Sequence, residues 1–239
     1  MKYIISGGYS FSVDIDIEFE VYTYRFVATS KHPYPCVQIA VYENTIGNID
    51  MLNYYANCSF SEKLLEKGTG SIHMLKTALT YVSNKHPHVK QYDIQDETYM
   101  ELPGKPLITA RRLLMGEKGW YEEHLHAIPT QRTKYMIQYL RDPKKRTLYQ
   151  DKIPNADKTW WTPKNAMQVC YSIKCPGSVL GTTWYISKNT IDSYGIDYTV
   201  EDSMKGGSCK YQHIFEKALQ RKPSYIINLE AKYRYDNKN

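Results

Sequence analysis

Residues 11–21 alternate strictly between apolar and polar side chains, and this alternation limits the possible folds of the chain. The odd positions are apolar, and the even positions up to residue 20 are serine or acidic: Phe11, Val13, Ile15, Ile17, Phe19 and Val21 against Ser12, Asp14, Asp16, Glu18 and Glu20. Successive side chains of a strand point to opposite faces, so this pattern predicts a strand with one buried face and one acidic, solvated face. The apolar phase shifts near residues 22–26, which predicts a bend or bulge. Residues 37–41 and 51–60 are further candidate strands, so we expect β structure over residues 1–60.

The apolar period then changes to that of a helix. A helix that starts at Ser71 would carry one apolar face, formed by Ile72, Leu75, Leu79 and Val82. His86-Pro87 ends it, because proline cannot continue a helix. Residues 90–95 are predicted to form a strand parallel to the strand before the helix. This order predicts a right-handed strand–helix–strand crossover.

The remaining segments are shorter. Helices are predicted at residues 106–115 and 133–140, the second ending at Asp142-Pro143, and residues 144–146 and 155–157 are interpreted as a connecting loop. Strand-like pieces follow at 169–173 and 182–186, then a short helix at 212–220 and a polar tail at 232–239. We divide the chain into a core, residues 1–150, and a C-terminal extension, residues 151–239.

Composition limits the class of protein. A chain of 239 residues with 42% apolar residues can bury a core, which excludes wholesale disorder. The net charge of +6 permits an anionic partner without requiring one. Twenty-three tyrosines against five phenylalanines suit half-buried faces within an assembly, although codon bias in an AT-rich genome explains the ratio equally well.

Cysteine usage and hydropathy bear on the compartment. The five cysteines are odd in number and scattered, which does not indicate a disulfide framework and favours a reducing compartment: Cys36, Cys58, Cys170, Cys175 and Cys209. No apolar run reaches membrane-spanning length, and the N-terminal segment lacks a signal-peptide core. We therefore expect a cytoplasmic protein that does not enter a membrane.

A glycine turn precedes the predicted helix and carries the clearest chemical signal. Its residues are Gly68, Thr69, Gly70 and Ser71. A Gly-x-Gly turn at the start of a helix leaves backbone N–H groups free at the positive end of the helix dipole, where they can hold a pyrophosphate. An ordinary tight turn has the same sequence, so the motif gains weight only from the strand and helix that flank it.

With those flanking elements, residues 53–127 resemble the GNAT family of acyl-CoA-dependent N-acyltransferases. That family has a splayed strand, a Gln/Arg-x-x-Gly-x-Gly/Ala loop that opens a helix, a further strand, and a helix that ends in a Gly-Phe-like pair. Here the pair corresponds to Gly119-Trp120. The chain looks most like the divergent GNAT-like proteins of large DNA viruses, which would place it in the host cytoplasm or in the virion. The resemblance implies an α/β (α+β) fold with a mixed, largely antiparallel sheet flanked by helices.

The resemblance also implies a binding site and a reaction. The N–H groups of Gly68, Thr69, Gly70 and Ser71 would contact the pyrophosphate of acetyl-CoA or another acyl-CoA. Phe60 and Ser61 would lie where the pantetheine arm pairs with the strand edge. An acyl group would pass to an amine, with Asp96 as candidate base and Tyr121 as candidate acid.

Two positions depart from the family pattern. The family's Gln or Arg falls on Leu65, and the tyrosine that often acts as general acid falls on Met115. These departures favour an alternative: a structural or interaction protein, such as a minor virion or capsid component, that retains the scaffold, binds protein partners and needs no cofactor.

Other chemistries have weaker support in the sequence. Cys170 and Cys175 are too widely spaced for a usual structural zinc pair, and His124 and His126 lack helical metal-site spacing, so we expect no metal. Cys170 has no obvious histidine partner for a nucleophile. Single-stranded nucleic acid remains a third option, with basic residues beside a tryptophan pair: Arg111, Arg112, Lys144, Lys145 and Arg146 with Trp160-Trp161.

Overall fold

The computed structural model describes residues 2–27, 35–42, 46–52, 69–96 and 108–202. This part of the chain forms a mixed α/β fold around a nine-stranded, open and largely antiparallel sheet, in the order β7-β8-β6-β5-β4-β3-β2-β1-β9. The strands are β1 (Lys2–Ser6), β2 (Tyr9–Glu18), β3 (Val21–Val27), β4 (Pro35–Val41), β5 (Ile46–Leu52), β6 (Gln91–Gln95), β7 (Ile128–Pro129), β8 (Thr183–Ser187) and β9 (Thr199–Glu201). This confirms the predicted class of sheet.

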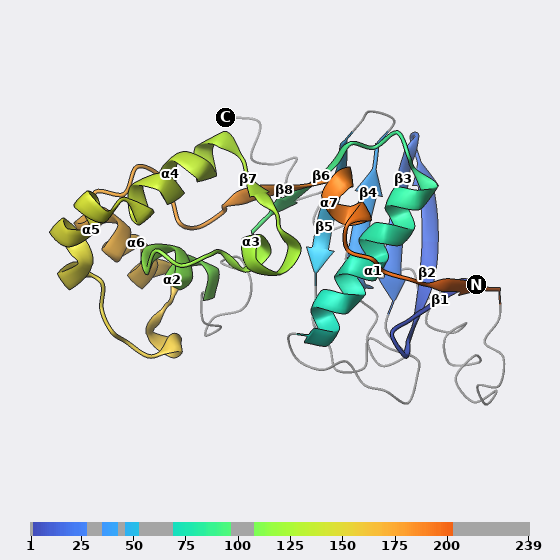
Figure 1. The fold of residues 1–239 in the computed structure, drawn as a ribbon, viewed down its shortest axis with the longest axis horizontal. Coiled ribbons are helices and arrows are strands. Elements are labelled where there is room, and N and C mark those ends of the chain that lie inside the picture. Colours follow the sequence, from blue (N-terminus) through green and yellow to red (C-terminus); the bar gives the residue numbers. More distant parts are fainter. Residues whose placement is uncertain (1, 28–34, 43–45, 53–68, 97–107, 203–239) are drawn as a thin grey trace, which may run out of the picture.

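The helices form two groups. The long helix α1 (Thr69–Lys85) lies across one face of the sheet beside α7 (Lys188–Asp192), and a second group lies beyond β8 (Figure 1). The other helical elements are α2 (Ile108–Leu114), α3 (Trp120–Leu125), α4 (Gln131–Arg141), α5 (Pro143–Tyr149), η2 (Gln150–Lys152), η3 (Lys158–Trp160) and α6 (Pro163–Ser172).

The predicted crossover is present. β5 and β6 are parallel, and α1 connects them in the chain. The apolar face of α1 is buried as the sequence predicted, with Leu75, Leu79 and Val82 fully covered. The strand before α1 is Ile46–Leu52, whereas the sequence predicted a strand at residues 51–60, of which residues 53–60 lie outside the described residues.

The strand with the alternating pattern is buried only in its first half. Phe11 and Val13 belong to the core, whereas Ile15 and Ile17 are exposed, so the prediction of one continuous buried face was wrong. The described aromatic contacts near this end of the hairpin fall on β3: the ring of Tyr81 in α1 lies edge-on to Tyr24, and the ring of His86 lies beside Tyr24 and Tyr22. Ile15 and Ile17 lie on β2, toward the turn, and remain exposed.

The phase shift after the alternating segment comes from a hairpin. Phe19 and Glu20 both have positive φ, at 48° and 67°, which turns the chain back into β3. After the turn the core-facing residues fall on even positions, and Tyr24 pairs with Ile15 and Phe26 with Val13. A register shift also occurs between Phe26 and Val27, at the end of the segment where a bulge was predicted.

Two helices replace elements that were predicted otherwise. Residues 144–146 were interpreted as part of a connecting loop, but they belong to α5: Asp142 accepts a hydrogen bond from the Lys144 N–H (2.9 Å) and Pro143 opens the helix. Residues 169–173 were assigned to a strand, but most of them belong to α6, which Thr162 caps by accepting from the Asn165 N–H. In both cases the polar residue before a proline is a helix start, and the short apolar run alone did not distinguish helix from strand.

Strands from beyond residue 150 are integral to the sheet. β8 lies between β6 and β7, and β9 pairs with β1 at the opposite edge. Residues 1–150 therefore share their sheet with residues of the predicted extension. The helix at 212–220 and the tail at 232–239 lie outside the described residues.

Candidate functional site

The glycine turn is described only where it enters α1. Thr69 and Gly70 are the first two residues of the helix, and Ser71 is buried in its first turn. Phe60, Ser61, Leu65 and Gly68 lie outside the described residues. The first turn of α1 contains no acidic residue, so no side chain of that turn neutralises the positive end of the dipole of this 17-residue helix.

The crossover fixes where this helix end lies. β5 and β6 run parallel, and the intervening helix runs back along them. The N-terminus of α1 therefore lies at the C-terminal edge of the sheet, that is, where the carboxyl ends of both strands lie. Asp96 directly follows β6 at that edge and is only 4% exposed. Its N–H donates to the carbonyl of Thr182 (2.8 Å), which extends the ladder between β6 and β8 by one residue.

Tyr121 lies in α3 and packs against the sheet near the same edge. Its ring centroid is 6.4 Å from that of Trp184 on β8. Trp184 is fully buried, and its indole N–H donates to the Thr182 hydroxyl (3.0 Å). Gly119 precedes α3, and a Cβ there would lie 2.9 Å from the Trp184 ring, so glycine permits this close approach.

Asp96 and Tyr121 lie on one face of the sheet. Trp184 pairs directly with Ile94, so the two side chains share a face. Asp96 comes two residues after Ile94 and therefore points to that face, where Tyr121 packs on Trp184. The structure thus brings the two predicted catalytic residues to the same face and the same end of β6.

Contacts between helices hold α3 and α1 on this face. The Tyr194 hydroxyl donates to the carbonyl of Leu125 in α3 (2.7 Å), and the Lys76 ammonium of α1 lies 4.7 Å from the centre of the Tyr194 ring. Burial raises the pKa of Tyr194 above its ordinary value, so its phenol remains a donor even in alkaline solution.

An ion pair fixes the start of α3. The two oxygens of Glu122 accept from the two terminal nitrogens of Arg141 (3.0 and 2.6 Å), and Glu122 also accepts from the Gly119 N–H. Burial alone would raise the pKa of Glu122, but the hydrogen bonds and charge of Arg141 outweigh it, so the pKa is lowered. Sequence reasoning missed this pair because its residues lie 19 positions apart.

Comparisons with protein-family profiles, curated protein sequences and solved structures give no match.

Within the described residues, no helix combines the length and apolar character needed to cross a membrane.

The thiols have local partners. Cys170 and Cys175 are not disulfide-bonded, and the Cys170 thiol donates a hydrogen bond to the carbonyl of Gly177 (3.2 Å). The hydrogen bond between the two thiols lowers the pKa of Cys170 and raises that of Cys175. Cys36 is disulfide-bonded, which its sequence spacing did not predict.

The structure shows no metal-binding arrangement among the residues it describes. His124 lies beside the carboxylate of Glu123 (3.7 Å), and His126 occupies a left-handed position at the end of α3. No group of three or more histidine, cysteine or acidic residues is arranged to hold a metal ion within the described ranges. Cys209 and His213 lie outside them.

Among the basic residues suggested for nucleic acid, Arg112 and Arg146 are engaged within the protein. Arg112 pairs with Glu123, and the Arg146 guanidinium donates to the carbonyl of Leu140 (3.3 Å). Trp161 is completely buried, so the expectation that both tryptophans could stack on bases was wrong. Trp161 belongs to the hydrophobic core, to which Ala166 and Val169 of the following helix α6 also contribute.

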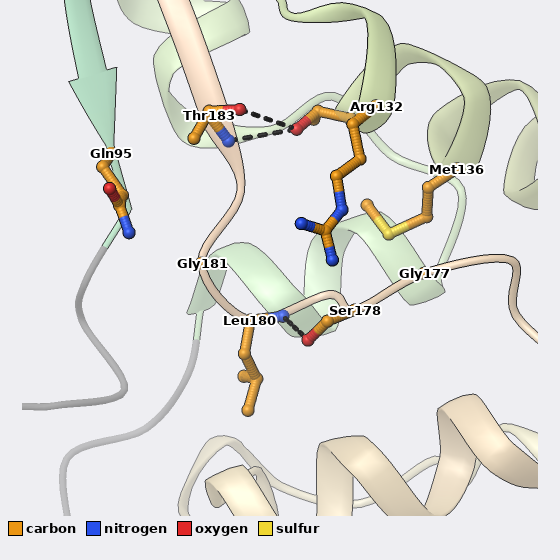
Figure 2. Close-up of a pocket in the computed structure, with 9 residues that line it drawn as sticks. Gln95, Arg132, Met136, Gly177, Ser178, Leu180, Gly181 and Thr183 are labelled. Atoms are coloured by element: carbon orange, nitrogen blue, oxygen red, sulfur yellow. Dashed lines mark hydrogen bonds between the residues drawn. The ribbon is translucent and has the colours of Figure 1, made fainter. Parts of the chain in front are cut away.

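The structure also contains a cavity that the sequence did not indicate. Its volume is about 250 Å³, and it is lined by the end of β6, the start of β8, α4 and the loop at 177–181 (Figure 2). Gln95 and Thr183 are a directly paired couple, so both point to the face opposite Trp184 and Asp96. No local sequence signal connects these segments, which lie up to 88 positions apart along the chain (183 − 95).

Proposed function

We propose that this protein is an acyl-CoA-dependent N-acyltransferase that transfers an acyl group from acyl-CoA to an amine. One observation carries the proposal: the N-terminus of α1, Asp96 and Tyr121 all belong to the edge of the sheet where the parallel strands β5 and β6 end. Such an edge is where open α/β sheets bind ligands, and a helix N-terminus there suits a pyrophosphate.

The chemistry requires little more from the chain. The first turn of α1 would hold the acyl-CoA pyrophosphate through its N–H groups. Asp96 would accept a proton from the attacking amine, and Tyr121 would donate one to the leaving thiolate. The buried setting of Asp96 supports this assignment, because exclusion of water strengthens electrostatic interactions with a bound substrate.

Calorimetry with acetyl-CoA is the direct test. We expect saturable heat and a rise in the melting temperature, and no heat at millimolar acetyl-CoA would overturn the proposal. Thr69→Glu places a carboxylate in the first turn of α1, so it should stabilise the helix slightly while it weakens acetyl-CoA binding roughly tenfold or more.

A matched control separates the binding effect from a general change in charge. Thr80→Glu adds the same charge to the same helix about 16 Å further along, at 1.5 Å per residue. It should leave the affinity for acetyl-CoA within about twofold of the wild type. Equal losses in both variants would show that the N-terminus of α1 is not the binding site. Asp96→Asn and Tyr121→Phe should lower turnover while acetyl-CoA binding persists.

A second candidate function rests on a different observation. The tip of the β2–β3 hairpin exposes an apolar group, which we call the hairpin patch, formed by Ile15, Ile17, Phe19 and Tyr22. Phe19 is 98% exposed and Ile17 60% exposed. Exposed apolar groups of this kind mark surfaces that bind other proteins.

This observation favours a non-catalytic interaction protein, such as a minor virion component. For that candidate we expect the protein at fixed stoichiometry in purified particles. Phe19→Ser should remove it from the particles while the purified chain keeps its stability, because an exposed side chain contributes little to folding. Retention of the variant at full stoichiometry would exclude the hairpin patch as the contact.

A further inference from the structure

We propose that the cavity beside Gln95 is a binding site for a small organic oxyanion, a carboxylate on a small apolar body, held by Arg132. This inference does not depend on the acyltransferase proposal, because the cavity lies on the opposite face of the sheet from Asp96.

The position of Arg132 is the first argument. Its side chain extends from α4 into the space between Met136 and the loop at Gly181 (Figure 2). Arg132 makes no hydrogen bond or ion pair with any residue that the structure describes. Other arginines differ in this respect: Arg25 and Arg141 each pair with a carboxylate. A guanidinium presents a planar set of donors that matches a carboxylate, so the group is available for a ligand.

The electrostatic setting favours an anion. Arg132 lies in the first turn of α4, an 11-residue helix whose first turn contains no acidic residue. A cation at this end of a helix is repelled by the helix dipole. The described residues that line the cavity include no acidic side chain, so none of them compensates the charge of Arg132. A bound anion would interact favourably with both the guanidinium and the helix.

The remaining walls define the size and polarity of the ligand. A cavity of about 150 Å³ holds a benzene ring, so about 250 Å³ admits a ligand of that size but not a nucleotide. Met136 and Leu180 supply apolar surface, and the amide of Gln95 supplies a polar contact at the other end. The Thr133 hydroxyl is already used, since it accepts from the Thr183 N–H (3.0 Å). Arg132 is therefore the charged anchor.

Titration with benzoate, followed by amide NMR shifts of Gly177 and Gly181 in the full chain, tests the proposal. We expect saturable shifts with a dissociation constant on the order of millimolar, as befits so small a ligand. Benzyl alcohol has nearly the same shape without the charge and should bind roughly tenfold or more weakly. Inorganic phosphate distinguishes a bare oxyanion site from one that also requires an apolar body, and it should bind more weakly than benzoate.

Variants of α4 locate the site. Arg132→Gln should weaken benzoate binding roughly tenfold or more, and the affinity of Arg132→Lys for benzoate should lie between those of the wild type and Arg132→Gln. Lys134→Gln removes the same charge two residues away, outside the cavity wall, and should change the affinity less than twofold. Arg132→Gln should keep the wild-type melting temperature, because Arg132 is exposed and no hydrogen bond or ion pair joins it to the described part of the chain.

Three results would overturn the proposal. They are unchanged benzoate affinity in Arg132→Gln, equal losses in Arg132→Gln and Lys134→Gln, and shifts by benzyl alcohol that equal those by benzoate. Phosphate binding as tight as benzoate would overturn the assigned apolar body.

Discussion

Gly119→Ala tests the tight packing that positions α3, and its cost can be estimated from the geometry. The added Cβ would lie 2.9 and 3.0 Å from two carbons of the Trp184 ring. The backbone at Gly119 (φ −60°, ψ 157°) suits alanine, so the cost is steric rather than conformational. Trp184 is fully buried and held through its indole N–H by Thr182, so the ring has little freedom to move.

Overpacking of a rigid core site costs about 1–3 kcal/mol. Alanine also caps a helix less well than glycine, at about 0.5 kcal/mol, and this is offset by a similar loss of entropy in the unfolded chain. We therefore expect Gly119→Ala to lower the free energy of unfolding by about 2 kcal/mol, which corresponds to roughly 4–8 °C in the melting temperature.

A double-mutant cycle isolates the steric contribution. Trp184→Phe removes the two ring carbons that the new Cβ would meet, so Gly119→Ala should cost about 1–2 kcal/mol less in that background than in the wild type. Urea unfolding followed by far-UV circular dichroism gives the four free energies. A coupling energy below about 0.5 kcal/mol would refute the reasoning, because contact with Trp184 would then not explain why this position holds glycine.

Two further predictions concern pH and charge. Arg141→Met should destabilise the protein by about 2 kcal/mol, between the values for exposed and buried pairs, since the side chains of Arg141 and Glu122 are 32% and 23% exposed. The pKa of Glu122 is lowered in the folded state, so the pair stabilises the protein fully above about pH 4.3, and this contribution is lost as the pH falls through the folded pKa. In urea unfolding, the free energy of unfolding of Arg141→Met should therefore fall less steeply with decreasing pH than that of the wild type. Burial lowers the pKa of His86, with a smaller contribution from the charge of His88, and the Nε2 atom of His86 lies 2.6 Å from the Tyr24 hydroxyl. The unfolded chain therefore binds a proton at this histidine more readily than the folded protein, so the free energy of unfolding should fall as the pH drops below about 6.5. His86→Gln should remove that slope between pH 7 and 5 in the same assay, and an unchanged slope would show that another group titrates there.

Local patterns predicted the elements whose period was strong. The helical face of α1, the parallel strand after it and the strand at 183–187 all follow from side-chain periodicity and from proline. Exposure at the hairpin could not be predicted in the same way. Alternation shows which residues share a face, but the elements packed on that face decide how many of them are buried, and Ile15 and Ile17 remain exposed near the turn.

The sites depend on tertiary contacts that the sequence does not display. Asp96 and Tyr121 were each chosen from local context, and only the pairing of Ile94 with Trp184 shows that they share a face. The cavity is still less accessible to prediction, because Arg132 and Thr183 become neighbours only when β8 inserts between β6 and β7. In the sequence, Arg132 cannot be distinguished from an ordinary solvated arginine, and only the structure shows that it lies on a cavity wall.

The end of β6 makes the two proposed sites separable by experiment. Gln95 and Asp96 are adjacent in the chain, yet they point to opposite faces of the sheet, the first toward the cavity and the second to the face on which Tyr121 packs. If each site is independent, Arg132→Gln should leave the heat of acetyl-CoA binding unchanged, and Thr69→Glu should leave the benzoate shifts unchanged. If one ligand instead alters the affinity for the other, the pairing of β6 with β8 connects the two faces at this point, and the coupling should be reciprocal in both titrations. A change in only one direction is thermodynamically inconsistent with two linked binding sites and would show that one probe binds elsewhere.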